Sequence, residues 1–134
     1  DATCADESQL PALRQYVTDG GLLVVTHETS LRDKQGKERP DFAWNELLGV
    51  RYEGRSPYNE ANYGLLNEEW RGPLLDYPIL LTSGALHIAC TTAEPLAELV
   101  YPETPRTAEK FLWETAYNPF KQKSGCPLIT LNRG

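Results

Sequence analysis

Apolar residues near the start of the chain recur with the period of an amphipathic helix. Leu10, Leu13 and Val17 fall on one stripe within the otherwise mostly polar segment 5–19. Gly20 follows directly, and glycine adopts the left-handed conformation with which many helices end. The pattern therefore predicts a helix over residues 5–19 that packs its apolar stripe on the core.

A short aliphatic run, Leu22 to Val25, comes next. A continuous apolar run after a glycine turn is typical of a strand buried on both faces, as in a parallel sheet. Helix followed by strand is half of a βαβ unit, and the other strand is expected before residue 1. The pattern thus predicts an α/β fold and a chain that is a segment of a longer protein.

The polar segment 26–39 leaves the carboxyl end of that predicted strand. Open α/β sheets bind their ligands at this edge. We therefore expect a small polar molecule or a sugar to bind here. The candidate ligand-binding residues are His27, Glu28, Thr29, Ser30 and Asp33.

The rest of the chain alternates short apolar runs with glycine and proline. A short helix is predicted to begin at Asp41, as its N-cap, and to end at Gly49, with a strand over 50–52. Residues 53–78 read as a long, irregular, aromatic-rich excursion whose aromatic side chains are expected to be buried. Further short strands are predicted at 79–82, 86–89, 96–101, 110–117 and 128–131, the first two of these joined through a turn at 83–84.

Length and charge narrow the function classes. With 134 residues, the chain suits a single domain spanning residues 1–134. Its formal net charge is −6 and its basic residues form no stripe, which argues against a nucleic-acid or anionic-membrane surface. No feature points to a cofactor, and none indicates a compartment.

The cysteines offer little support for redox, metal or nucleophilic chemistry. Cys4, Cys90 and Cys126 permit at most one disulfide, and no C-x-x-C pair suggests zinc. A cysteine nucleophile paired with His27 or His87 would need an exposed strand-to-helix elbow, which none of the three has. Free cysteines are more often small buried hydrophobes.

Carboxylates between residues 28 and 46 leave a hydrolase open as an alternative. Glu28 with Asp33 could form a glycosidase pair, which needs two carboxylates about 5 to 9 Å apart across a cleft and one raised pKa. Charged loop residues are more often solvated or capping groups. His27 beside Glu28 could also begin a metal site, but a lone histidine is more often structural, and we expect no metal.

The chain resembles a known group over residues 6–52. It is similar to the β-galactosidase trimerisation domain and its relatives in glycoside hydrolases, which share the class I glutamine amidotransferase-like fold. The likeness resumes faintly over 125–130. The motifs that carry it are Tyr16-Val17 followed by Gly20-Gly21, Glu28-Thr29-Ser30, Pro40-Asp41-Phe42 and Leu47-Leu48-Gly49-Val50.

The resemblance implies a flavodoxin-like three-layer sandwich, incomplete in this chain, that has no catalytic role. The amidotransferase cysteine elbow has no counterpart, because Leu22 to Val25 run into Thr26. In the family, such a domain follows a catalytic (β/α)8 barrel and contributes to subunit association. The expected partners are accordingly the rest of a parent chain, further copies of it, and a carbohydrate.

Overall fold

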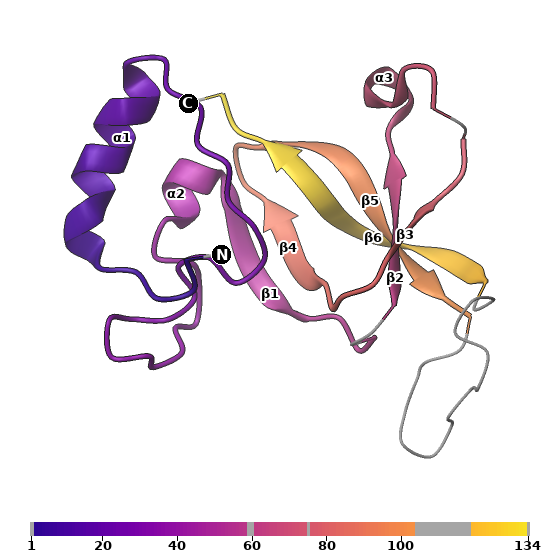
Figure 1. The fold of residues 1–134 in the computed structure, drawn as a ribbon, viewed down its shortest axis with the longest axis horizontal. Helices are drawn as coiled ribbons and strands as arrows, with labels where there is room; N and C mark the ends of the chain where they lie inside the picture. Colours follow the sequence, from indigo (N-terminus) through magenta and orange to yellow (C-terminus); the bar gives the residue numbers. More distant parts are fainter. Residues whose placement is uncertain (1, 59–60, 75, 104–118, 134) are drawn as a thin grey trace.

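The structure is a computed structural model that describes residues 2–58, 61–74, 76–103 and 119–133 (Figure 1). Its described part combines short helices with antiparallel strands. In chain order the elements are the 3-10 helix η1 (Glu7–Gln9), α1 (Leu10–Thr18), α2 (Asn45–Leu48), β1 (Val50–Arg55), β2 (Asn62–Leu66), α3 (Glu68–Arg71), β3 (Ile79–Leu81), β4 (Leu86–Cys90), β5 (Glu94–Pro102) and β6 (Phe120–Leu131).

The strands of the described part form a two-stranded sheet, β1-β4, and a four-stranded sheet in the order β3-β2-β5-β6. Every named pair is antiparallel. Within the described residues, parallel pairing is confined to a single bridge between Cys4 and Arg32. The α/β content agrees with the sequence, but a parallel, flavodoxin-like three-layer arrangement is not confirmed, because these sheets are antiparallel.

The predicted N-terminal helix is present as η1 and α1, and it begins at a capping box. The Asp6 carboxylate accepts the backbone N–H of Ser8 at 3.1 Å, and the Gln9 side chain accepts the N–H of Asp6 at 3.4 Å. Gly20, at φ +91°, follows the helix end as expected. The predicted stripe is only partly covered: Leu10, Leu13 and Val17 are half-buried, α1 has no fully buried residue, and Tyr16 beside the stripe is 52% exposed.

Leu22 to Val25 belong to no strand in the structure, which corrects the prediction of a buried strand. Leu22 is 74% and Val24 is 75% exposed, while Leu23 and Val25, which alternate with them, are half-buried. This alternation has the period of a strand. A ladder requires a neighbouring strand, and no described residue supplies one beside this segment.

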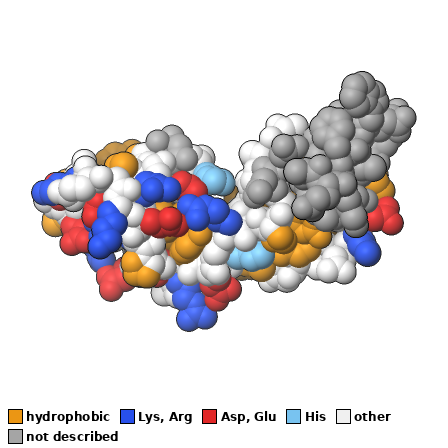
Figure 2. All heavy atoms as spheres, turned by 90° about the horizontal axis from the view of Figure 1, so that it is seen from below, with side chains coloured by type: hydrophobic (Ala, Val, Ile, Leu, Met, Phe, Trp, Pro, Cys, Tyr) orange, Lys and Arg blue, Asp and Glu red, His pale blue; other side chains and the backbone are white. Residues whose placement is uncertain are grey.

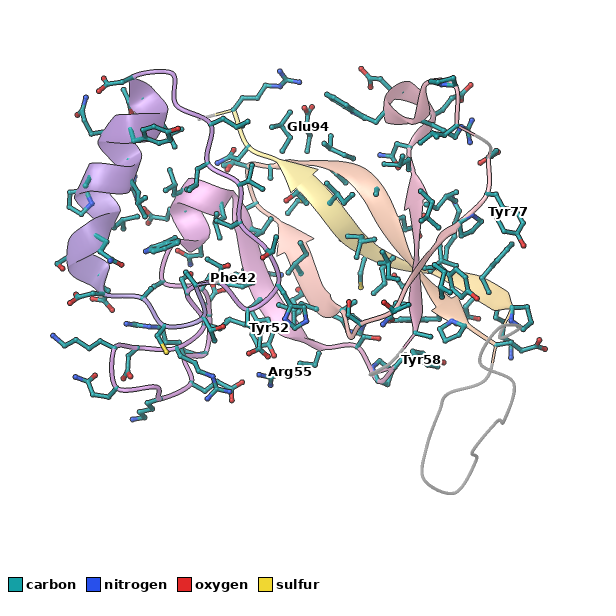
Figure 3. All side chains as sticks on the ribbon, viewed as in Figure 1. Phe42, Tyr52, Arg55, Tyr58, Tyr77 and Glu94 are labelled. Carbon is teal, nitrogen blue, oxygen red and sulfur yellow. The ribbon has the colours of Figure 1, made fainter. Side chains whose placement is uncertain are left out.

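Asp41 does not cap the second helix as predicted. Helix α2 begins four residues later, at Asn45, and ends at Gly49 as expected. The Asp41 carboxylate instead accepts the backbone N–H of Phe42 at 2.8 Å and of Tyr52 at 2.7 Å. It therefore joins the segment before α2 to β1, where Phe42 and Tyr52 pack edge to face at 5.8 Å (Figure 3).

The excursion over 53–78 is more regular than predicted, because it contains the end of β1, all of β2 and α3. The strands predicted at 50–52, 79–82, 86–89, 96–101 and 128–131 correspond to β1, β3, β4, β5 and β6. The turn at 83–84 does not make a hairpin, since β3 pairs with β2 and β4 with β1. The strand predicted at 110–117 lies outside the described residues.

The core against which the loops pack lies at the two-stranded sheet. Its buried members are Leu31, Phe42, Val50, Leu86 and Ala93. In the four-stranded sheet, Ala97, Leu99 and Val100 of β5 are at most 2% exposed. Leu31, within the polar segment 26–39, belongs to this core together with Val50 of β1 and Leu86 of β4, which holds residues 27–30 close to these strands.

Candidate functional site

An open cavity of about 430 Å³ lies where three loops meet. Residues 27–28 come from the turn before Leu31, residues 55–56 from the end of β1, and residues 83–85 from the segment before β4. The volume falls within the roughly 300–1,000 Å³ of small-molecule pockets. The lining residues are His27, Glu28, Arg55, Ser56, Ser83, Gly84 and Ala85.

An ion-pair network occupies one wall of the cavity. Arg55 donates from Nε at 3.0 Å and from Nη2 at 2.8 Å to the same Oε1 atom of Glu28. Its Nη1 donates to Glu38 at 2.9 Å. Arg55 projects from the end of β1, well apart from Tyr58 and Tyr77 (Figure 3). The network therefore fastens two points of the 26–39 loop to β1.

This network sets the protonation of the site. The hydrogen bonds from Arg55 lower the pKa of Glu28, against a smaller opposing effect of burial, and the positive charges of Arg55, His27 and Arg32 lower it further. The same hydrogen bonds, to Glu28 and Glu38, raise the pKa of Arg55. Glu28 is thus held as a carboxylate and Arg55 as a cation at neutral pH.

The turn that presents His27 and Glu28 has an unusual backbone. His27, at φ +47°, and Ser30, at φ +65°, both adopt the left-handed region that non-glycine residues rarely visit. The turn is closed by the backbone N–H of Leu31, which donates to the Glu28 carbonyl at 3.0 Å. Strained backbone of this kind gathers at functional sites. Here it brings the His27 side chain to the cavity.

Thr29 and Ser30, two of the predicted binding residues, do not line the cavity. Both are buried, at 4% and 0% exposure. The Thr29 hydroxyl donates to the Thr26 carbonyl at 2.6 Å, and the Ser30 backbone bonds to Ala2 and Ala43. The structure therefore gives both residues a place in holding the turn, beneath the side chains that face the cavity.

Asp33, the fifth predicted binding residue, also lies outside the cavity. Its Oδ1 atom accepts the backbone N–H groups of Gln35 and Lys37, each at 2.9 Å. Its own N–H donates to the Lys37 carbonyl, also at 2.9 Å. Asp33 therefore closes the turn between residues 33 and 37, as aspartates do in Asx turns.

Asn62 fixes the far side of the cavity. It is fully buried, and its Nδ2 donates to the carbonyls of Tyr58 at 2.8 Å and Ser83 at 2.9 Å. Its Oδ1 accepts the Ser56 hydroxyl at 3.0 Å. The Ser56 N–H donates in turn to the Ala85 carbonyl at 2.8 Å. One buried amide thus locks the loops of residues 56–58 and 83–85 together.

The sequence did not identify Arg55, Ser56 or residues 83–85 as part of a site. They lie 27 or more positions from Glu28, and no motif connects them. Charge gave no signal either, because segment 26–39 holds three acidic and four basic residues and so calls for no cationic partner from elsewhere. Arg55 stands next to Gly54, where a bulge interrupts the pairing of β1 with β4, and bulges often re-aim side chains.

None of the three cysteines is fully buried, contrary to expectation, because Cys4 is exposed and Cys90 and Cys126 are half-buried. All three cysteines are free. Burial raises the pKa of Cys90, the reverse of what a nucleophile needs. His87 Nε2 lies 2.7 Å from the Tyr101 hydroxyl, between β4 and β5, and far from His27 in the sequence. Within the described residues, no group of three metal-ligating side chains is present.

The aromatic side chains of the excursion divide into two groups. Tyr58 stacks on Tyr101 at 5.0 Å and Tyr63 packs on Phe120 at 5.9 Å, and both are half-buried, so the burial prediction holds for them only in part. Trp70, 41% exposed, and Tyr77, 61% exposed, contradict that prediction. Tyr77 lies at the β3 side of the molecule with other exposed apolar side chains. These are Trp70, Leu74, Ile79 and Leu80.

Helix α1 and the segment after it lie at the opposite end of the molecule from β3 (Figure 1), and they carry a second set of exposed apolar side chains. We call this surface the N-terminal face; it consists of α1 and residues 22–25, with Tyr16, Leu22 and Val24 as its exposed members. The surrounding surface mixes acidic and basic side chains (Figure 2). No described helix is both long and apolar enough to cross a membrane.

The fold recurs in parts of solved glycoside hydrolases. The α-L-fucosidase isoenzyme 2 of Paenibacillus thiaminolyticus matches with a TM-score of 0.68 and 16% identity, over 94% of this chain and 18% of that chain. A β-galactosidase from Rahnella sp. R3 matches with a TM-score of 0.63 and 17% identity, over 73% of this chain and 15% of that chain. Gan42B, a GH42 β-galactosidase from G. stearothermophilus, matches with a TM-score of 0.60 and 17% identity, over 78% of this chain and 15% of that chain.

These likenesses concern the fold alone, since all are at 16–17% identity. The sequence matches no protein-family model and no curated protein. The chain spans 15–18% of the length of these three enzymes. At the level of fold, this chain is therefore similar to a small portion of much longer glycoside hydrolases.

Proposed function

We propose that this chain is a non-catalytic structural module of a glycoside-hydrolase-type protein, of the β-galactosidase trimerisation kind. The N-terminal face carries the proposal. Soluble proteins rarely leave a contiguous apolar surface open to water, and such a surface marks an interaction site. The fold likeness to 15–18% of glycoside hydrolase chains supports a longer chain as its partner.

The backbone of residues 22–25 supports a strand as the occupant of this face. Within the described residues, its hydrogen bonding is limited to the Leu22 carbonyl, which accepts the Tyr16 hydroxyl at 3.3 Å. Unpaired N–H and C=O groups beside alternating apolar side chains form a template for strand addition. The proposed occupant is a strand of the same, longer chain, laid against residues 22–25.

The carboxylates support a non-catalytic role over the hydrolase alternative. A glycosidase general acid needs a raised pKa, whereas Arg55 lowers the pKa of Glu28. Asp33 is engaged with the backbone of its own turn. Glu28 therefore lacks the raised pKa of a glycosidase general acid, and Asp33 is occupied within its own turn.

Hydrogen exchange tests the assignment directly. The backbone amides of residues 22–25 are expected to exchange fast in the isolated 134-residue chain and to be protected in the full-length protein. Equal exchange in both would overturn the proposal. Light scattering on the full-length protein tests the association role, for which an oligomer is expected and a monomer would count against it.

A pair of variants adds a second readout. Leu22→Thr with Val24→Thr keeps strand propensity but removes apolar surface, so it is expected to lower the melting temperature of the full-length protein. Leu80→Thr is the matched control, because Leu80 is also exposed, at 46%, but lies on β3 at the opposite end of the molecule (Figure 1). If the double variant and the control have the same melting temperature, the proposed docking is contradicted.

A further inference from the structure

We propose that the cavity between residues 27–28, 55–56 and 83–85 binds a single neutral sugar ring. Glu28 and Arg55 contact neighbouring hydroxyl groups of that ring, and His27 and Ser83 lie at its rim. The choice of a sugar among neutral polar molecules rests on the proposed function. The binding itself is argued from the charges and hydrogen-bonding groups of the cavity.

Charge favours a neutral ligand. Two carboxylates, Glu28 and Glu38, already pair with the guanidinium of Arg55. An anion would therefore be repelled by two negative charges, while the positive charge of Arg55 is already compensated. A cation would meet Arg55 and, close by, the positive Arg32 that acts on Glu28. A neutral molecule with many hydroxyl groups meets no such opposition.

The hydrogen-bonding groups left over fit a pair of adjacent hydroxyls. Both bonds from Arg55 to Glu28 end on Oε1, and in the described part of the chain Oε2 accepts none. A guanidinium has five N–H donors, of which Arg55 uses three on the two glutamates. One free acceptor beside free donors matches two neighbouring hydroxyls, each of which both donates and accepts.

The rim of the cavity offers additional polar groups. The side chains of His27 and Ser83 are exposed, and neither makes a hydrogen bond to another described side chain or backbone group. Gly84 and Ala85 bring little side-chain bulk to the lining. A few convergent polar groups around a less polar floor is the composition expected of a small-molecule site.

The site is preformed. Asn62 fixes Ser56 and residue 83 from inside the protein, while Arg55 ties the turn of residues 27–28 to β1. Binding therefore requires little ordering of loops, which lowers its entropic cost. The exposed position of the cavity and its few donors indicate a weak site, with a Kd on the order of millimolar.

Amide chemical-shift titration of the 134-residue chain tests the proposal, with methyl β-D-galactopyranoside and L-fucose as probes. The expected result is saturable shifts at residues 27–28, 55–56 and 83–85 with at least one probe. Inorganic phosphate and putrescine are the anionic and cationic arms. No saturable shift with either sugar, or tighter binding of phosphate or putrescine, would overturn the inference.

Three variants locate the binding. Glu28→Gln removes a charge-assisted acceptor and is expected to raise Kd about tenfold or more. Ser83→Trp fills the cavity without touching the ion pairs and is expected to abolish binding. Glu53→Gln is the control, since Glu53 lies on β1 but pairs with Arg51 outside the cavity. Unchanged affinity in Ser83→Trp contradicts the site even if Glu28→Gln is poorly folded.

The two proposals fail independently. If the chain binds a sugar but the amides of residues 22–25 exchange equally fast in the isolated and full-length proteins, only the structural-module proposal is overturned. If those amides are protected in the full-length protein but no sugar changes the amide chemical shifts, only the sugar site is overturned.

Discussion

Arg55 reaches across 27 positions of sequence to place two hydrogen bonds on one oxygen of Glu28, at 3.0 and 2.8 Å. This contact joins the end of a strand to a turn whose backbone is strained at His27. It also leaves the other oxygen of Glu28 without a hydrogen bond from the described residues, where we propose that the ligand binds. Stability, pH response and the proposed binding site are therefore linked through the same pair.

Replacing Arg55 by methionine is expected to destabilise the fold by about 1 kcal/mol, the upper end for exposed ion pairs, because Glu28 and Glu38 both lose their partner. Urea denaturation measures the free energy of unfolding. Arg51→Met is the control, since Arg51 pairs with Glu53 alone and is 62% exposed. If both variants lose the same unfolding free energy, the pairing of Arg55 with two glutamates contributes no more stability than a single ion pair.

The stability contributed by Glu28 is expected to depend on pH. Because the folded state lowers the Glu28 pKa from 4.5, the charged form stabilises the fold above that value. This contribution is lost as the pH falls through the lowered, folded-state pKa. The unfolding free energies of the wild type and Glu28→Gln should therefore differ most near neutral pH and converge in acid.

Denaturation at pH values between about 3 and 7 measures this convergence. Asp6, whose pKa is also lowered, first by the hydrogen bond from the Ser8 backbone, gives a pH dependence of the same sign. It is present in both proteins, so it cancels from their difference. A difference that stays constant over this range would contradict the assignment to Glu28.

Gly49→Ala is expected to cost more than about 2 kcal/mol of unfolding free energy. Gly49 has φ +69°, and a Cβ there would lie 2.7 Å from the Ala93 nitrogen and 2.7 Å from the Thr92 hydroxyl. Gly20→Ala is the matched control, because Gly20 has φ +91° but open space around its Cβ position. It should cost about 1 kcal/mol, from backbone strain alone.

Thermal or urea unfolding of these two variants separates backbone strain from close packing. If Gly49→Ala is no less stable than Gly20→Ala, then residues 92–93 move away from the new Cβ without a loss of unfolding free energy, which contradicts the prediction.

Asn62→Ala is expected to lower the unfolding free energy by about 2–4 kcal/mol, because it leaves the carbonyls of Tyr58 and Ser83 without their buried donor. Asn67→Ala is the control. Asn67 also donates from its side chain to a backbone carbonyl, that of Pro95 at 2.7 Å, but it is exposed. A loss of less than about 1 kcal/mol is expected for the control, because water replaces the bond.

The same variant has a consequence at the cavity. Loosening residues 56–58 and 83–85 is expected to weaken methyl β-D-galactopyranoside binding in Asn62→Ala, with Glu28 and Arg55 unchanged. Amide titration under conditions where the variant remains folded measures the effect. Wild-type affinity in a folded Asn62→Ala protein would show that the buried amide does not preorganise the site.

Local sequence determined most of the elements. The helix before Gly20, the helix ends at Gly20 and Gly49, and the apolar runs of β4 and β5 act over a few residues, and each appears where the pattern placed it. Local patterns also brought His27 and Glu28 to attention. Helix propensity, turn chemistry and side-chain period depend only on neighbours along the chain, so the sequence alone could specify them.

Tertiary structure decided how these elements pair and which side chains meet. Leu22 to Val25 have the composition of a buried strand, but a strand forms only where a neighbour accepts its hydrogen bonds, and no described residue does. Thr29, Ser30 and Asp33 follow Glu28 closely, yet their hydrogen bonds hold the backbone. Arg55 and Ser83 reach the cavity because antiparallel pairing of β1 with β4 closes loops between residues far apart in sequence, a choice that no local pattern contains.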